Sequence, residues 1–332
     1  MGHEMSREDY ERISLFYYET SLNNPCLLPD VGIDESLLKY SGTDSNAVLQ
    51  AYSNQLVSLV PGYVRSLGSA LGSFTPIPNA VGLGALVISM IIEICQKSST
   101  QTNDNTYSML QRVFGEEKAS AVRDTMAEYL KRHTMFIKNE QRLQMELHRL
   151  EAQLSGHLTI LKNSLLLDGQ MRSRGLKIWV NGASFHIQML IHEARLIGQS
   201  GQPVSNKVET IKAAINLYLQ DLDNLLNKYK TFKISDTNSN RHQICGCGGF
   251  ACGCGPISCY LRNREGQCGV NLSDRSEATE GCGNDNVIKA YINHFFTKYQ
   301  PILGLRSHFL DMKNNLNSAI SQHFTFTPPY TT

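Results

Sequence analysis

The chain reads EQRLQMELHRLEAQLSGHLTILKNSLLL over residues 140–167, and this stretch decides the fold class. Its leucines recur every three or four residues, which places them on one face of an α-helix, and charged residues flank that face. Leu158 marks a stutter in the repeat, so the pattern favours a helix bundle. The predicted assembly seam comprises Leu143, Leu147, Leu150, Leu154, Leu161 and Leu165.

Helical signals continue on both sides of this seam. Between Glu116 and Leu167 there is no proline and a single glycine, which predicts one helix of about 50 residues, or roughly 75 Å. Further helices are predicted over residues 6–18, 44–60, 171–197, 204–232, 287–299 and 304–323. We find no convincing strand pattern and no fixed-period repeat. The sequence therefore predicts an all-α fold: an elongated bundle of long helices with an apolar helical hairpin and a cysteine-rich loop insert.

Composition suits a protein with a substantial core. The 332 residues are 41% hydrophobic and 18% charged, and the net charge is +1. Without a Lys/Arg cluster, nucleic-acid binding is not predicted. Changes in composition divide the chain into an N-terminal helix and linker (1–43), a helix with the apolar hairpin (44–96), a long-helix bundle (97–235), a cysteine-rich insert (236–285), and C-terminal helices with an aromatic, proline-bearing tail (286–332).

The apolar hairpin occupies residues 66–92, which carry no charged side chain. Pro76 and Pro78 prevent one continuous helix across this stretch, so we expect two helical arms. A spanning helix needs about 20 apolar residues, so this run favours conditional membrane contact over permanent anchoring. Burial in a protein core is the alternative. The candidate membrane-inserting residues are Val81, Leu83, Leu86, Val87, Ile88, Ile91 and Ile92.

The N-terminal sequence bears on localisation. It has no apolar signal-peptide core, which predicts cytosolic synthesis without a signal peptide, and later release or membrane association stays open. The first six residues, MGHEMS, match the short N-myristoylation pattern through Gly2 and Ser6. One myristoyl chain gives only reversible membrane binding, so a second signal would be needed. The apolar hairpin is a candidate for that signal.

Seven cysteines form the second strong signal. They are Cys245, Cys247, Cys252, Cys254, Cys259, Cys268 and Cys282. Three interpretations stay open: disulfides, a thiolate site for zinc or copper(I), and free thiols. Because seven is an odd number, complete pairing requires Cys26, Cys95 or a partner chain.

Catalytic patterns are weak in this sequence. His186 and His192 do not form a zinc-binding helix motif, and we interpret them as partly buried helix histidines. No nucleophile, base and oxyanion arrangement emerges, and no small-molecule substrate is evident. We therefore predict that the protein is not an enzyme.

The order of these segments resembles two groups of proteins. An N-terminal helical region, the apolar hairpin at 66–92 and the long amphipathic helices up to residue 232 resemble α-helical pore-forming proteins of the cytolysin A type and the rapunzel-like proteins of bony fish. The resemblance covers about residues 40–235. It implies that the apolar element is packed away in the monomer and enters the membrane as subunits assemble into a ring. The cysteine-rich insert departs from the cytolysin pattern.

Two functions follow as expectations. The first is a membrane-active, oligomerising, pore-forming-like protein whose partners are further copies of itself and a lipid membrane. The second is a structural protein that assembles into a fibre or scaffold through its long helices and its cysteine-rich insert.

Overall fold

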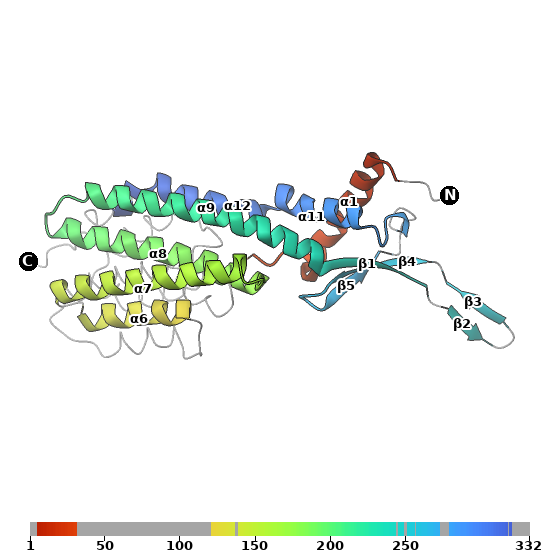
Figure 1. Ribbon diagram of the computed structural model, residues 1–332, viewed down its shortest axis with the longest axis horizontal. Coiled ribbons are helices and arrows are strands. Elements are labelled where there is room, and N and C mark those ends of the chain that lie inside the picture. Colours follow the sequence, from red (N-terminus) through yellow and green to blue (C-terminus); the bar gives the residue numbers. More distant parts are fainter. Residues whose placement is uncertain are drawn as a thin grey trace, which may run out of the picture. The chain divides into compact units, whose positions relative to one another are not determined.

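The structure is a computed structural model, shown in Figure 1. It describes residues 5–31, 121–136, 139–243, 245–248, 251–255, 257–272, 279–317 and 319–320. The predicted hairpin at 66–92 with its candidate membrane-inserting residues, the lipidation candidate Gly2, and Cys95 lie outside the described residues.

The chain divides into two compact units. The sheet unit comprises Met1–Val31, Gln170–Ser173 and Asn224–Gly304. The helix unit comprises Gly32–Gly169, Arg174–Asp223 and Leu305–Thr332. Each unit is described on its own below.

Five helices supply the described part of the helix unit. They are α6 (Ala121–Phe136), α7 (Glu140–Leu166), and the portions of α8 (Ser173–Gln199), α9 (Ser205–Asp236) and α12 (Gln300–Asn314) that belong to this unit. The single long helix predicted over 116–167 is therefore wrong, because α6 ends before α7 begins. The physical cause lies at Asn139, whose side chain accepts a hydrogen bond from the Arg142 backbone N–H at 3.0 Å and caps a new helix.

The leucine face of α7 packs inside the helix unit. Five of the six predicted seam leucines are buried, and Leu161 is half-buried. Leu158 is buried as well, which shows that the apolar face continues through the stutter. Gly182 of α8 allows this packing, because a Cβ atom there would lie 2.8 Å from both the Leu158 and the Val122 side chains. The seam thus serves the core of this chain.

The sheet unit contains the structure that the sequence did not predict. Strands β1 (Thr237–His242), β4 (Ser258–Asn263) and β5 (Cys268–Asn271) form an antiparallel sheet in the order β1-β4-β5. Strands β2 (Cys245–Gly248) and β3 (Ala251–Cys254) form a separate hairpin. The all-α prediction therefore needs correction: the protein is rich in helices but also has a small antiparallel sheet in place of the predicted loop insert.

The β1–β4 pair and the β2–β3 pair differ in register. The first pairing ends at His242 opposite Ser258, and the second begins at Cys245 opposite Cys254. Two residues join β1 to β2, whereas three join β3 to β4. The two pairings are therefore offset by one residue.

Two helices complete the sheet unit. Helix α1 (Arg7–Leu22) begins with a capping box in which Ser6 and Asp9 satisfy each other's backbone N–H groups. It packs on α11 (Asp285–Lys298) through aromatic rings that meet edge to face, Tyr17 with Tyr291 and Tyr18 with Phe295. A 3-10 helix, η1 (Pro25–Leu27), follows α1 and contacts β4 and β5.

Candidate functional site

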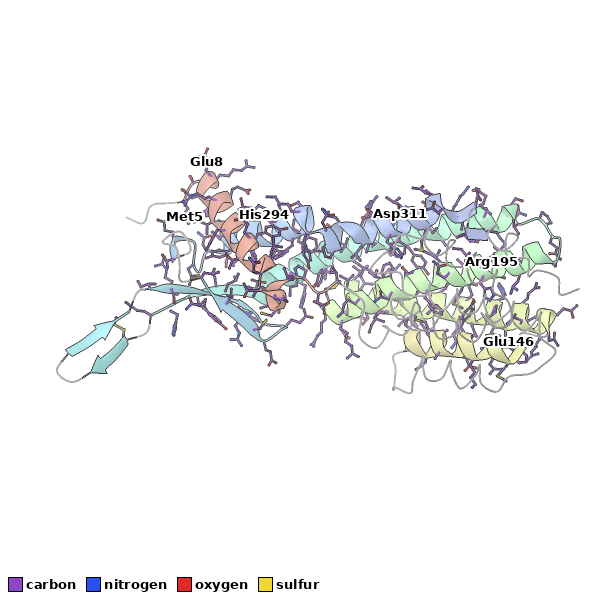
Figure 2. All side chains as sticks on the ribbon, turned by 180° about the vertical axis from the view of Figure 1, so that it is seen from behind. Met5, Glu8, Glu146, Arg195, His294 and Asp311 are labelled. Atoms are coloured by element: carbon purple, nitrogen blue, oxygen red, sulfur yellow. A yellow bond between two sulfur atoms is a disulfide. The ribbon has the colours of Figure 1, made fainter. Side chains whose placement is uncertain are left out.

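Helix α8 carries polar side chains into the core of the helix unit. Residues 176–196 are all buried, and Figure 2 shows Arg195 lying among the helices. A helix buried on every side is expected to be apolar. Eight of these residues are polar or charged instead: Lys177, Asn181, Ser184, His186, Gln188, His192, Glu193 and Arg195.

His186 links α8 to α7 and α9. Its Nε2 lies 2.6 Å from Glu151 Oε1, and its Nδ1 lies 2.9 Å from the Tyr218 hydroxyl. In the neutral tautomer that fits both partners, Nε2–H donates to the carboxylate and Nδ1 accepts from the hydroxyl. Burial alone would raise the pKa of Glu151, but the His186 hydrogen bond and nearby positive charges lower it overall. Burial raises the pKa of Tyr218 well above its usual value, which keeps the hydroxyl protonated.

Two further residues of α8 make polar contacts with neighbouring helices. Glu193 Oε1 lies 3.2 Å from His148 Nδ1 of α7, and Glu193 Oε2 lies 3.0 Å from Lys207 Nζ of α9. The Tyr129 hydroxyl of α6 forms a hydrogen bond with His192 Nδ1. His186 and His192, predicted to be partly buried helix histidines, are buried and form hydrogen bonds with neighbouring helices.

On the face of α8 that meets α12, only some of the buried polar groups have hydrogen-bond partners. Ser184 Oγ lies 2.7 Å from His308 Nε2, and Gln188 Nε2 lies 3.6 Å from Met312 Sδ. Asn181, one turn from Ser184 and 1% exposed, finds no partner for either amide atom among the described residues. His308 Nδ1 likewise has no described partner. An unsatisfied buried polar group typically costs about 1–3 kcal/mol, so the α8–α12 contact is less stable than an apolar one of the same size.

Burial also shifts the protonation of His308. The ring is 2% exposed, and removal from water lowers its pKa to about 4. His308 is therefore neutral at pH 7, and it becomes protonated only when the pH falls well below 6.5, the usual pKa of histidine.

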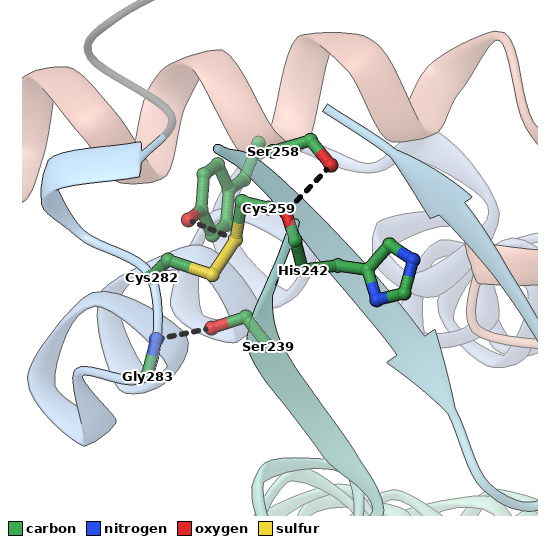
Figure 3. Close-up of a disulfide and its surroundings, with 7 residues drawn as sticks. Ser239, His242, Ser258, Cys259, Cys282 and Gly283 are labelled. Atoms are coloured by element: carbon green, nitrogen blue, oxygen red, sulfur yellow. Dashed lines mark hydrogen bonds between the residues drawn. A yellow bond between two sulfur atoms is a disulfide. The ribbon is translucent and has the colours of Figure 1, made fainter. Parts of the chain in front are cut away.

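Among the residues that the structure describes, two disulfides lie in the sheet unit. Cys245–Cys254 joins β2 to β3, and Cys259–Cys282 joins β4 to the segment before α11. Figure 3 shows the second disulfide, and the Tyr17 hydroxyl lies 3.3 Å from Cys259 Sγ. The disulfide interpretation is thus confirmed for four of the seven clustered cysteines.

The other clustered cysteines have different surroundings. Cys247 and Cys252 are opposite each other in the backbone register of β2 and β3, and their side chains lie outside the described residues. Cys268 is a free thiol in β5. Within the described part of the chain, no three His, Cys, Asp or Glu side chains gather as a metal site. The zinc or copper(I) site stays a prediction.

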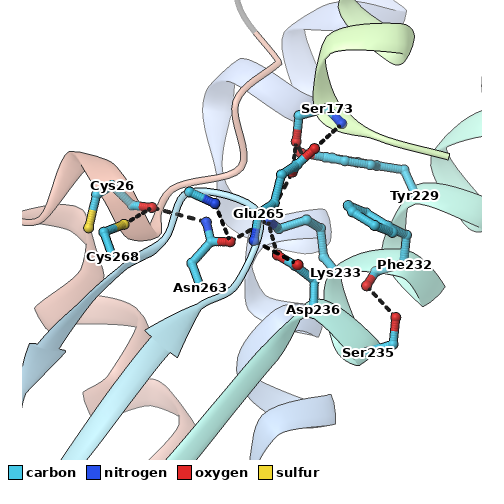
Figure 4. Close-up of polar contacts among 11 residues, drawn as sticks. Cys26, Ser173, Tyr229, Phe232, Lys233, Ser235, Asp236, Asn263, Glu265 and Cys268 are labelled. Atoms are coloured by element: carbon cyan, nitrogen blue, oxygen red, sulfur yellow. Dashed lines mark hydrogen bonds and ion pairs between the residues drawn. The ribbon is translucent and has the colours of Figure 1, made fainter.

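A charged cluster around the buried Lys233 lies beside the sheet and is shown in Figure 4. Lys233 Nζ, on a side chain 2% exposed, lies 3.0 Å from Asp236, 3.6 Å from Glu265 and 3.3 Å from Asn263 Oδ1. Glu265 accepts from both the backbone N–H of Ser173 at 2.8 Å and its hydroxyl at 2.5 Å. The cluster thus fastens the last turn of α9 to the turn between β4 and β5.

Sequence reasoning missed the polar face of α8 and this charged cluster. Lys177, Asn181, Ser184 and Gln188 repeat at helical spacing, and that repeat was a readable signal. The partners of Lys233 lie on a helix end, a strand and a turn, so their meeting depends on the tertiary fold.

Comparison with known proteins gives no further assignment. The chain matches no family model, and neither a curated protein nor a solved structure is significantly similar to it. Within the residues that the structure describes, no helix combines the length and the apolar character needed to cross a bilayer.

Proposed function

We propose that this protein is a membrane-active, oligomerising helical protein in which residues 66–92 insert into lipid when the helix unit opens. The observation that carries the proposal is the polar character of the buried helix α8. The apolar, uncharged sequence of residues 66–92 supplies a segment suited to lipid. Insertion of this segment also requires a helix unit whose packing can change.

The buried polar groups of α8 supply that ability. Buried ion pairs contribute little net stability, because desolvation offsets their attraction. Asn181 and the Nδ1 atom of His308 lack described partners, and both would gain hydrogen bonds with water if the packing around α8 opened. The closed packing therefore carries a cost that opening removes, which is a property suited to a protein that rearranges at a membrane.

The outward face of α7 supports self-association. Met145, Ile160 and Leu167 are 59%, 68% and 77% exposed, and their spacing places them on one side of the helix. Ala152 and Gly156 lie on the same side and are exposed. Small residues between exposed apolar side chains permit close approach of a second helix. This face supports assembly without disturbing the buried leucines.

A vesicle-leakage experiment tests the function. The full chain is added to dye-loaded vesicles at pH 7 and at pH 4.5, and also after reduction or limited proteolysis. We expect leakage under at least one of these conditions, and we expect Val87→Asp to abolish it, because a charge at mid-bilayer costs at least about 2.5 kcal/mol.

The matched control is Ser98→Asp, which adds the same charge to the polar stretch just after the apolar segment. It should leak like the parent. The function is rejected if the parent releases no dye under any condition, or if a folded Val87→Asp protein releases dye as fast as the parent.

A further inference from the structure

Two free cysteines meet in the sheet unit although 242 positions separate them in the sequence. Cys26 lies in η1 and is exposed, and Cys268 begins β5 and is half-buried. Neither belongs to one of the two disulfides described above. Their meeting is a consequence of the tertiary fold and does not depend on the function proposed above.

Hydrogen bonds to the Cys26 carbonyl oxygen place the Cys268 thiol beside Cys26. Cys268 Sγ donates to the Cys26 carbonyl oxygen at 3.1 Å, and Asn263 Nδ2 donates to the same oxygen at 3.0 Å. Figure 4 shows Cys26 and Cys268 beside each other, with the Cys268 thiol directed at the Cys26 carbonyl oxygen. Gly266 leaves room for the Cys268 thiol, because a Cβ atom at this position would lie only 3.2 Å from Cys268 Sγ.

We propose that Cys26 and Cys268 form a reversible dithiol–disulfide site that exchanges with small-molecule disulfides such as glutathione disulfide. The exposed position of Cys26 admits the small molecule, and the adjacent Cys268 is placed to displace it.

The chemistry proceeds in two exchange steps. The Cys26 thiolate attacks one sulfur of glutathione disulfide, so a Cys26–glutathione bond forms, the original S–S bond breaks, and one glutathione thiolate leaves. Cys268 then loses its proton to solvent and attacks the Cys26 sulfur, which releases the second glutathione thiolate. The two protein thiols are oxidised by two electrons, and one glutathione disulfide is reduced to two glutathione molecules.

The environments of the two thiols fit this order. Burial, together with the neighbouring Cys26, raises the pKa of Cys268 to about 11, so this thiol is protonated at pH 7. Cys26 is exposed and therefore meets the oxidant first. Cys26 is thus the attacking thiol and Cys268 the resolving thiol.

Oxidation would fasten the segment after α1 to the sheet. In the dithiol form, the Cys26 carbonyl is held by hydrogen bonds from Asn263 and Cys268, and Asn263 also contacts Lys233 of the charged cluster. A covalent bond would close a loop containing most of the chain. Long loops lose much conformational entropy on closure, so the oxidised form should resist unfolding of the sheet unit better than the dithiol.

Thiol mapping of the full chain tests the proposal. The native protein is equilibrated in glutathione buffers from reducing to oxidising, the free thiols are alkylated, and the peptides are identified by mass spectrometry. We expect Cys26 and Cys268 to lose alkylation together, at one shared buffer ratio, and a cross-linked peptide that contains both cysteines to appear.

Two variants separate the steps. Cys268→Ser should accumulate a mixed disulfide between Cys26 and glutathione, whereas Cys26→Ser should leave Cys268 as a free thiol. If either variant fails to fold, the mapping of the parent protein decides alone. The proposal is overturned if the parent accumulates the Cys26–glutathione adduct without the cross-link, if Cys26 or Cys268 pairs with another cysteine, or if both stay alkylatable throughout.

Discussion

The ring of His308 is buried against Ser184, and burial lowers its pKa from 6.5 to about 4. In the unfolded chain the same ring becomes protonated below about pH 6.5, so the unfolded state binds more protons between pH 6.5 and 4. Stability must therefore fall as the pH falls through this window. The shift corresponds to a loss of about 3 kcal/mol once the pH is below 4.

His308→Gln tests this pH dependence. Glutamine keeps a group able to bond with Ser184 but has no charge to gain, so we expect a flatter stability profile between pH 6.5 and 4. Chemical denaturation at several pH values measures it. The exposed His242 provides the matched control, and His242→Gln should leave the profile unchanged. Equal slopes for the parent and His308→Gln would contradict the assignment.

At the level of the element, α7 presents two faces with different roles. Leu154 is fully buried, whereas Ile160 on the opposite side is 68% exposed. We expect Leu154→Ala to lower the free energy of unfolding by about 2–5 kcal/mol, because it removes core contacts and leaves a cavity. Ile160→Lys should change that free energy by no more than about 0.5 kcal/mol.

Ile160→Lys should affect assembly much more than it affects the free energy of unfolding. Ile160→Lys places a charge in the exposed apolar face, so it should reduce the oligomer formed in detergent or lipid while the monomer stays folded. Urea denaturation and light scattering measure the two properties separately. Finding that Ile160→Lys assembles like the parent would remove the outward face of α7 from the interface.

The elements also show what the sequence could reveal. The α7 helix was predictable because Leu143, Leu147 and Leu150 repeat at helical spacing, and all three are buried. Strand β1 was not, because TNSNRH has no apolar alternation, and β2 and β3 consist only of cysteine, glycine and alanine. Their pairing depends on backbone hydrogen bonds and cross-links. Local apolar patterns therefore predicted the helices but could not predict the sheet.

The same limit applies to the candidate sites. The polar repeat on α8 is visible in the sequence, but its partners His308 and Met312 lie more than a hundred positions away. The Cys26–Cys268 contact also joins distant segments. Such contacts arise from the packing of whole elements. A single sequence therefore shows which residue types are present but not which of them come into contact.

At the scale of the whole molecule, the two units depend on different kinds of stabilisation. The helix unit relies on buried leucines and on the polar contacts of α8. The sheet unit relies on aromatic packing between α1 and α11, on the charged cluster around Lys233, and on two disulfides. Because both disulfides of the described residues lie in the sheet unit, a reductant should act on that unit.

We therefore expect reduction to destabilise the sheet unit while the helix unit stays folded. Removing a native disulfide typically costs about 2–5 kcal/mol, and the buried Cys259–Cys282 disulfide contacts the Tyr17 hydroxyl of α1, so its loss should also loosen the packing of α1. Hydrogen exchange measured by mass spectrometry resolves the two units in one experiment. Protection should fall in α1 and in β1, β4 and β5, and it should persist in α7 and in residues 176–196 of α8.

The double variant Cys259→Ser/Cys282→Ser should reproduce the effect without reductant, whereas Cys245→Ser/Cys254→Ser should affect only β2 and β3. Equal loss of protection in α7 and α1 would show that the two units unfold together, and would contradict their separate stabilisation.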